Sequence, residues 1–237
     1  MYNITSYEYI NNNKENTILF IHGWGCNKKY MHNLAYNIKN CNCLLIDLPG
    51  FKENELFKSP KSFEEIAQII LNFINKNNFR IDYIVGHSFG GKLAVYLSNQ
   101  IKLKHMFLIA ASIYNKKRHL NYYIKVLAYK LLKRFKCMRK YLNNFGSDDY
   151  KILSPIMKKT MSNVINYKMY CHLKANKTPT TLIYGINDKI TPLYIAYKTK
   201  KHLFDCNIIK IKGDHFAYLH NITFLVNIIE SVVELNG

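Results

Sequence analysis

The chain has 237 residues, of which 49% are hydrophobic and 14% aromatic. This length and composition are typical of one globular α/β domain, or of one domain with an insertion. No segment approaches the roughly 18 to 20 consecutive apolar residues of a membrane span. The N-terminus has no basic start followed by an apolar stretch, so no secretory signal is indicated and we predict a cytoplasmic protein.

The chain is strongly basic, with 34 Lys and Arg against 15 Asp and Glu and a formal net charge of +19. Such a charge is typical of proteins with anionic partners. The sequence is also rich in Asn, Ile and Tyr, which AT-rich codons specify together with Lys. A biased codon composition is therefore an alternative explanation of the positive charge. The charge is nevertheless clustered, because residues 113–172 hold fourteen Lys or Arg against only Asp148 and Asp149.

The cysteine pattern favours reduced thiols. The six cysteines show neither CxxC pairs nor the Cys/His spacing of a zinc site, and we expect no metal. Cys41 and Cys43 open the apolar segment CLLID, where they are predicted to pack as small hydrophobic side chains.

Short β-branched and aromatic segments alternate with longer helical patterns along the chain. This alternation predicts an α/β fold: a mostly parallel sheet flanked by crossover helices. Ser62 and Glu65 form a capping box ahead of one helix, and Asn221 is a candidate N-cap for the last one. The predicted strands are 17–21, 43–47, 81–85, 105–110, 180–184 and 207–211, and the predicted helices are about 29–39, 63–74, 91–101, 193–203 and 221–235.

One stretch breaks the alternation. Residues 113–175 show helical patterns and no convincing strand, so we predict a helical cap inserted into a core of residues 1–112 and 176–237. Because the insertion follows a strand of the sheet, the cap is expected to cover the active site.

The strongest local motif is Gly86-His87-Ser88-Phe89-Gly90-Gly91, between a predicted strand and a predicted helix. GxSxG at this place is typical of a sharp turn that exposes a nucleophilic serine, here Ser88. The same segment begins like a phosphate-binding loop, GxxxxGK, but that motif requires Ser or Thr where this chain has Leu93. A nucleotide site is therefore disfavoured.

A serine nucleophile needs a base, and the base needs a carboxylate that orients it. Asp188 follows the predicted strand at 180–184, and His215 follows the one at 207–211. Asp214 is adjacent to His215 and is poorly placed to orient its ring, so a role in shaping the loop is the better interpretation. Asp47 ends a strand before a turn and is interpreted as structural.

The segment His22-Gly23-Trp24-Gly25 follows the first predicted strand. Acyl transfer passes through an oxyanion, which backbone N–H groups must stabilise. The candidate donors are the amides of Trp24 and Phe89, with His22 fixing the loop by hydrogen bonding. The Trp24 side chain either lines an acyl pocket or packs in the core.

The motifs HGWG, DLPGF, GHSFGG, YGINDKITP and GDHF, in this order, resemble those of the α/β-hydrolase superfamily. The resemblance runs from about residue 17 to the C-terminus. It implies a mostly parallel sheet, a catalytic triad of Ser88, Asp188 and His215, and oxyanion amides at Trp24 and Phe89. HGWG with DLPGF is most similar to small carboxylesterases, including those that cleave pimeloyl-acyl-carrier-protein methyl ester. Members with an aspartate nucleophile are disfavoured by Ser88.

We therefore expect a serine hydrolase that cleaves a small carboxylic ester, or a thioester, through an acyl-enzyme, without a cofactor. The basic cap suggests an acidic acyl carrier protein or an anionic lipid surface as a possible partner, whereas nucleic acid is not expected. A lysophospholipase differs only in substrate. The alternative of another class is a non-catalytic ligand receptor or scaffold with the same fold.

Overall fold

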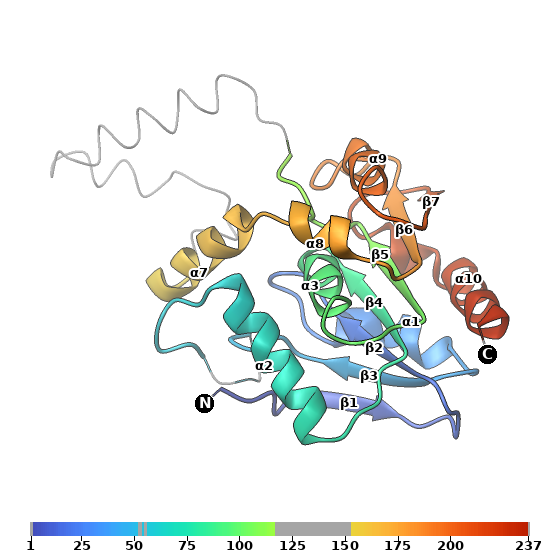
Figure 1. The fold of residues 1–237 in the computed structure, drawn as a ribbon, viewed down its shortest axis with the longest axis horizontal. Coiled ribbons are helices and arrows are strands. Elements are labelled where there is room, and N and C mark those ends of the chain that lie inside the picture. The colour runs from blue at the N-terminus through green and yellow to red at the C-terminus, as the bar shows by residue number, and fades with distance from the viewer. Residues whose placement is uncertain (1, 52–53, 55, 117–152, 237) are drawn as a thin grey trace, which may run out of the picture.

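A computed structural model describes residues 2–51, 54, 56–116 and 153–236. Within them the chain forms one seven-stranded sheet in the order β1-β3-β2-β4-β5-β6-β7 (Figure 1). All neighbouring strands are parallel except β1 (Tyr7–Ile10), which pairs antiparallel with β3. The other strands are β2 (Thr17–Ile21), β3 (Asn42–Ile46), β4 (Tyr83–His87), β5 (His105–Ile109), β6 (Thr180–Gly185) and β7 (Cys206–Ile211). The predicted α/β class is confirmed.

The central strands are continuous apolar runs because helices cover both faces of the sheet. Alternate residues of a strand point to opposite faces, so Ile18 and Phe20 enter one hydrophobic core and Leu19 and Ile21 enter the other. All four side chains are at most 1% exposed. The two cores fix the sheet between two helical layers.

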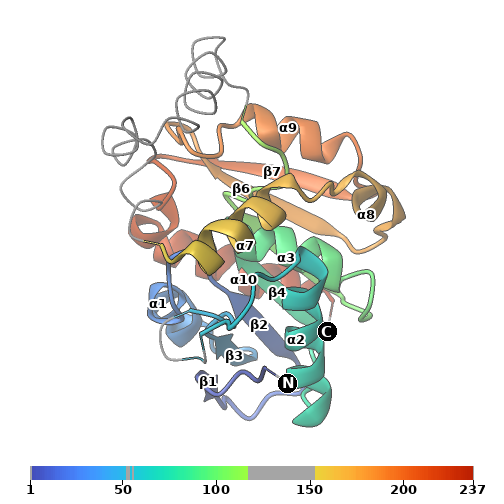
Figure 2. The ribbon, with the colours of Figure 1, turned by 90° about the vertical axis from the view of Figure 1, so that its left-hand side faces the viewer.

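The helices divide between these two layers (Figures 1 and 2). The core that contains Ile18 and Phe20 is closed by α1 (Lys29–Asn37) and α10 (Ile222–Leu235), which contact each other. The opposite core is closed by α2 (Phe63–Lys76), α3 (Phe89–Leu97) and α9 (Tyr194–Lys200). A short 3-10 helix, η2 (Ala217–His220), precedes α10.

Helix α2 begins as its sequence predicts. The Ser62 side chain accepts from the Glu65 N–H, and the Glu65 carboxylate accepts from the Ser62 N–H, which completes the capping box. Asn221, in contrast, occupies the N-cap position of α10 without a capping hydrogen bond from its side chain. Its side-chain amide instead donates to the carbonyl of Ala217 at 2.7 Å. The end of a helical turn leaves such carbonyls without a partner from the helix itself.

The predicted cap at 113–175 is only partly within the described residues, since 117–152 lie outside them. The described remainder forms two helices, α7 (Pro155–Asn166) and α8 (Tyr170–Ala175), and no strand. Helix α7 contacts α2, and α8 contacts α3. The boundaries of a separate cap stay a prediction.

Cys41 and Cys43 pack in the core, both with 0% exposure, as predicted. Burial raises the pKa of each thiol to about 12, so neither is a thiolate at neutral pH. No helix in the described part of the chain is both long and apolar enough to cross a bilayer.

Candidate active site

Ser88 occupies a strained turn between β4 and α3, with φ 51° and ψ −110°. A non-glycine residue in this conformation is costly, and such strain concentrates at functional sites. The turn is tight because glycines allow close contacts: a Cβ on Gly86 would lie 2.6 Å from the Gly90 carbonyl oxygen, and one on Gly90 would collide with the Ile21 carbonyl. The Ser88 N–H donates to the Ile109 carbonyl at 2.9 Å, which anchors the turn to β5.

Asp188 and His215 meet although they are 27 positions apart in the sequence. Asp188 follows β6 and His215 follows β7, and the neighbouring ends of these parallel strands bring the two loops together. The His215 Nδ1 lies 2.8 Å from the Asp188 Oδ2, and the carboxylate can only accept, so Nδ1–H is the donor. In the neutral ring this leaves Nε2 as the basic nitrogen.

Thr191 completes the surroundings of the carboxylate. Its Oγ1 lies 2.7 Å from Asp188 Oδ2 and 3.1 Å from His215 Nδ1, and the backbone N–H of Thr191 donates to Asp188 Oδ1 at 2.9 Å. Burial alone would raise the pKa of Asp188, but the hydrogen bonds from His215 and Thr191 outweigh it and lower the pKa. The carboxylate is therefore held ionised beside the imidazole.

His87, which directly precedes Ser88, supports the loop of His215. The His87 Nε2 donates to the backbone carbonyl of His215 at 3.1 Å, and its ring packs 4.9 Å from the His215 ring and 4.8 Å from that of Tyr218. Burial, followed by the neighbouring His215, lowers the pKa of His87 to about 3, so this ring is neutral near pH 7.

The loop after β2 lies directly against Ser88. A Cβ on Gly23 would lie 2.9 Å from the His87 Nδ1 and 3.2 Å from the Ser88 Cβ, so any larger residue would have to displace the His87 ring. The rings of Trp24 and Phe89 are neighbours, with centroids 5.6 Å apart. The two residues whose amides are the candidate oxyanion donors are thus neighbours, and both line the same cavity as Ser88.

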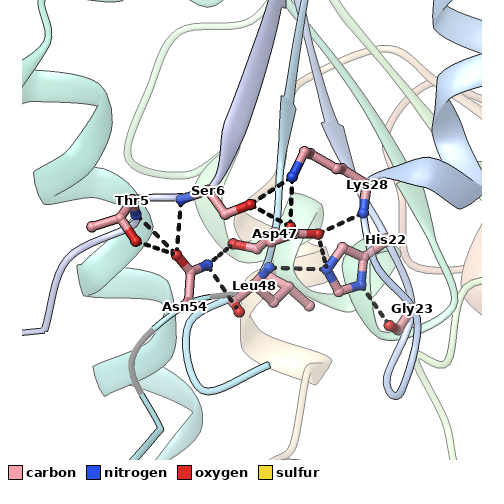
Figure 3. Close-up of polar contacts among 8 residues, drawn as sticks. All are labelled: Thr5, Ser6, His22, Gly23, Lys28, Asp47, Leu48 and Asn54. Carbon is pink, nitrogen blue, oxygen red and sulfur yellow. Dashed lines mark hydrogen bonds and ion pairs between the residues drawn. The ribbon is translucent and has the colours of Figure 1, made fainter. Parts of the chain in front are cut away.

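Buried hydrogen bonds of His22 hold the loop after β2 in place (Figure 3). The His22 Nδ1 donates to the Gly23 carbonyl at 2.7 Å, and its Nε2 accepts from the Leu48 N–H at 2.9 Å. These partners define a neutral ring, so the Asp47 carboxylate, 3.7 Å from Nε2, is not its ion-pair partner. His22 therefore holds the loop as the sequence predicted.

The cation that balances Asp47 is Lys28. Its ammonium lies 2.9 Å from Asp47 Oδ2, and its backbone N–H donates to Oδ1 at 2.6 Å. The Ser6 hydroxyl donates to the same carboxylate at 2.6 Å. Burial would raise the pKa of Asp47, but these contacts from Ser6 and Lys28 lower it. The Asn54 side chain accepts from the backbone N–H groups of Thr5 and Ser6 and donates to the Asp47 carbonyl, so it ties these residues to the end of β3.

A cavity of about 570 Å³ lies between the Ser88 turn, the loop of His215 and the loop after β2. Ser88, His215, Trp24 and Phe89 all line it, while Asp188 lies behind His215. Helix α7 contributes Met161, Val164 and Ile165 to the wall. The five residues expected from the sequence are thus brought together, and α7 adds apolar side chains to the wall of the same cavity.

Three further residues of the site were not identified from sequence. Thr191 stands in the segment YGINDKITP, and a threonine three residues after the acid was its only signal. His87 stands in the GxSxG motif, but nothing local indicates its contact with residue 215. Lys92 is the lysine of the GxxxxGK pattern, and no local signal indicates that it lines the cavity.

The sheet order, the strained Ser88 turn and the loops after β6 and β7 define the class of protein. The family model of the α/β-hydrolase fold matches residues 16–135, just over half of the chain, and the chain belongs to this family.

Individual relatives agree with this class. A pimeloyl-[acyl-carrier protein] methyl ester esterase of Wigglesworthia glossinidia brevipalpis is 27% identical over 92% of this chain and 93% of its own. Two solved structures share the fold: a lipase-esterase related protein of Clostridium acetobutylicum (TM-score 0.73, 21% identity, 96% and 98% of the two chains) and an esterase of Exiguobacterium antarcticum (TM-score 0.74, 14% identity, 96% and 94%).

Proposed function

We propose that this protein is a serine hydrolase that cleaves a carboxylic ester or thioester, with Ser88, Asp188 and His215 as its triad. The observation that carries the proposal is the Asp188–His215 hydrogen bond of 2.8 Å beside a cavity that both His215 and the strained Ser88 line. The esterase relatives support the same chemistry.

In the first half of the reaction, the Ser88 Oγ attacks the ester carbonyl while His215 Nε2 takes its proton. The negative charge that develops on the carbonyl oxygen is stabilised by the amides of Trp24 and Phe89. Collapse of this intermediate expels the alcohol, which takes the proton from His215, and leaves the acyl group on Ser88.

In the second half, His215 removes a proton from water, which attacks the acyl-enzyme. The acid leaves, and the proton returns from His215 to Ser88. The Asp188 carboxylate stabilises the imidazolium in both halves. These steps use only the side chains and amides of this chain.

The experiment is labelling with a fluorophosphonate and hydrolysis of short p-nitrophenyl esters by the wild type and by Ser88→Ala. We expect Ser88 to be labelled and the variant to lose activity by several orders of magnitude while it stays folded. A folded variant with more than about a tenth of wild-type activity would show that Ser88 is not the nucleophile. A folded wild type that is neither labelled nor active would favour the receptor or scaffold function.

A second candidate is an esterase for substrates linked to an acidic acyl carrier protein. It is supported by the name of the Wigglesworthia relative and by the fourteen Lys or Arg residues between 113 and 172, most of which lie outside the described residues. Electrostatic steering of a large anion falls steeply with salt. We therefore expect kcat/KM for a carrier-linked ester to fall with ionic strength while that for a free neutral ester stays constant. An equal response of both substrates would contradict this candidate.

A further inference from the structure

A buried lysine lines the cavity one helical turn after Ser88. Lys92 belongs to α3 and is only 2% exposed. Its ammonium donates a hydrogen bond of 2.7 Å to the backbone carbonyl of Val164 in α7, and it lies 5.7 Å from the centre of the Phe63 ring. Lys92 therefore stands where the core of the protein faces helix α7.

The charge of Lys92 has no acidic counterpart among the described residues. None of their carboxylates forms an ion pair with it, and no Asp or Glu is among those that line the cavity. An ammonium carries three N–H donors, and in the same part of the chain only the Val164 carbonyl accepts from it. Donors remain for a group that enters the cavity.

Keeping this charge is costly. A buried ammonium without an anion loses several kcal/mol of hydration, whereas the next residues of α3, Leu93 and Ala94, are apolar and fully buried. Burial lowers the pKa of Lys92 to about 8, so the side chain is still mostly charged at neutral pH. The ammonium is the one fixed positive charge among the described residues that line the cavity.

We propose that Lys92 determines specificity by binding a carboxylate, or a similar anionic group, of the substrate. The inference rests on the proposed hydrolase function and names its substrate class: an ester that carries a negative charge near the scissile bond. The backbone positions of Ser88 and Lys92 lie about 6 Å apart along the axis of α3. A substrate with a short spacer between its ester and its carboxylate can therefore reach both residues. A carrier-linked methyl ester is uncharged beside its ester bond, so this proposal favours a small acidic ester.

The test compares monomethyl succinate, glutarate and adipate with their primary-amide analogues, which keep the shape but lack the charge. For at least one spacer, wild-type kcat/KM should favour the acid by roughly tenfold to a hundredfold, the range that a hydrogen bond to a charged group provides. Acetate esters of ω-hydroxy acids, with their amides, form a second arm that shows whether the anion belongs to the acyl or the alcohol part.

The variant is Lys92→Met, which keeps the length of the side chain and removes the ammonium. The ratio of acid to amide kcat/KM should fall toward one in this variant and be partly retained in Lys92→Arg. The matched control is Lys76→Met, which removes an exposed lysine from α2, away from the cavity, and should leave both the ratio and the activity unchanged.

Two results would overturn the proposal. One is a wild type that hydrolyses acid and amide esters equally well, which is decisive even if Lys92→Met does not fold. The other is an unchanged ratio in folded Lys92→Met. If the wild type hydrolyses none of the esters and Ser88 is not labelled by a fluorophosphonate, the hydrolase function itself is wrong, so the two failures are distinguishable.

Discussion

At the scale of single residues, Asp188 and Asp214 make different contacts. Asp188 accepts from the His215 ring, whereas the Asp214 Oδ1 accepts from the backbone N–H of Phe216 at 2.9 Å. An asparagine at 214 can still accept that hydrogen bond through its own Oδ1. An asparagine at 188 presents an N–H donor to the imidazole and favours the wrong tautomer.

We therefore predict that Asp188→Asn lowers kcat by about three to four orders of magnitude and that Asp214→Asn changes it little. Steady-state kinetics on a p-nitrophenyl ester, with circular dichroism to verify folding, makes the comparison. Equal losses in the two folded variants would contradict the assignment of Asp188 as the acid.

In the proposed triad Thr191 is a positioning residue, because it contacts Asp188 and His215 but is not among the residues that line the cavity. Thr191→Val removes the hydroxyl beside Asp188 Oδ2, and we expect kcat to fall about tenfold with little change in KM, since one hydrogen bond to a charged group is lost. Thr191→Ser keeps the hydroxyl and should restore most of the activity.

The matched control for this prediction is Thr199→Val. Thr199 is also buried, but its hydroxyl donates to the Ile195 carbonyl inside α9, away from the site. Both valine variants should lose some stability in urea unfolding, and only Thr191→Val should lose kcat. A similar loss of kcat in the two variants would assign Thr191 a merely structural role.

At the scale of elements, the loop between β2 and α1 depends on the Lys28–Asp47 pair. Removing one partner of a buried ion pair leaves an uncompensated charge, so Lys28→Met should lower the free energy of unfolding by about 3 kcal/mol. Because the loop also carries Trp24, kcat should fall as well. Lys29→Met, at the exposed neighbouring position, is the control. If urea unfolding gave the same free energy of unfolding for the two variants, the Lys28–Asp47 pair would not stabilise this loop.

The elements themselves show what the sequence pattern detects and what it misses. The six strands β2 to β7 were all predicted within about two residues, five of them fully buried. Strand β1 was missed because its residues, YEYI, are half exposed at the sheet edge and form no apolar run. Helix α3 begins at Phe89 rather than at 91, since Gly90 and Gly91 are helical here for close packing against Ile21 and Ala111, against their own helix propensity.

The residues of the candidate site also divide into those with a local sequence signal and those without one. Ser88, Asp188 and His215 were each identified because every one follows a recognisable strand within a local motif. The contacts of His87 and Lys92 join residues 128 and 72 positions apart, and such pairs are set by the packing of loops and helices rather than by any local pattern.

At the scale of the whole molecule, buried histidines predict sensitivity to acid. Burial lowers the pKa of His87 to about 3 and that of His105 to about 4, from 6.5 in the unfolded chain. Between pH 6.5 and about 4 the unfolded chain therefore binds protons that the folded chain does not. Stability should fall as the pH is lowered, by about 1.4 kcal/mol per pH unit for each histidine.

The measurement is urea unfolding across this pH range for the wild type and for His105→Gln. The variant has one fewer buried group to protonate, so its stability should decrease less steeply with acid. His105 is in contact with Thr181 and lies away from the cavity, which separates this effect from catalysis. Identical slopes in the two proteins would contradict the prediction.

The polar contacts around Asp47 also connect the beginning of the chain to catalysis. Ser6 donates to the Asp47 carboxylate, and the backbone N–H groups of Thr5 and Ser6 bind Asn54. Proteolytic removal of the segment through Ser6 would remove these contacts and loosen the loop between β2 and α1, and none of the removed residues lines the cavity. Limited digestion followed by an activity assay should therefore show turnover declining once the chain is cut beyond Ser6, so a short edge segment outside the cavity is expected to control its activity.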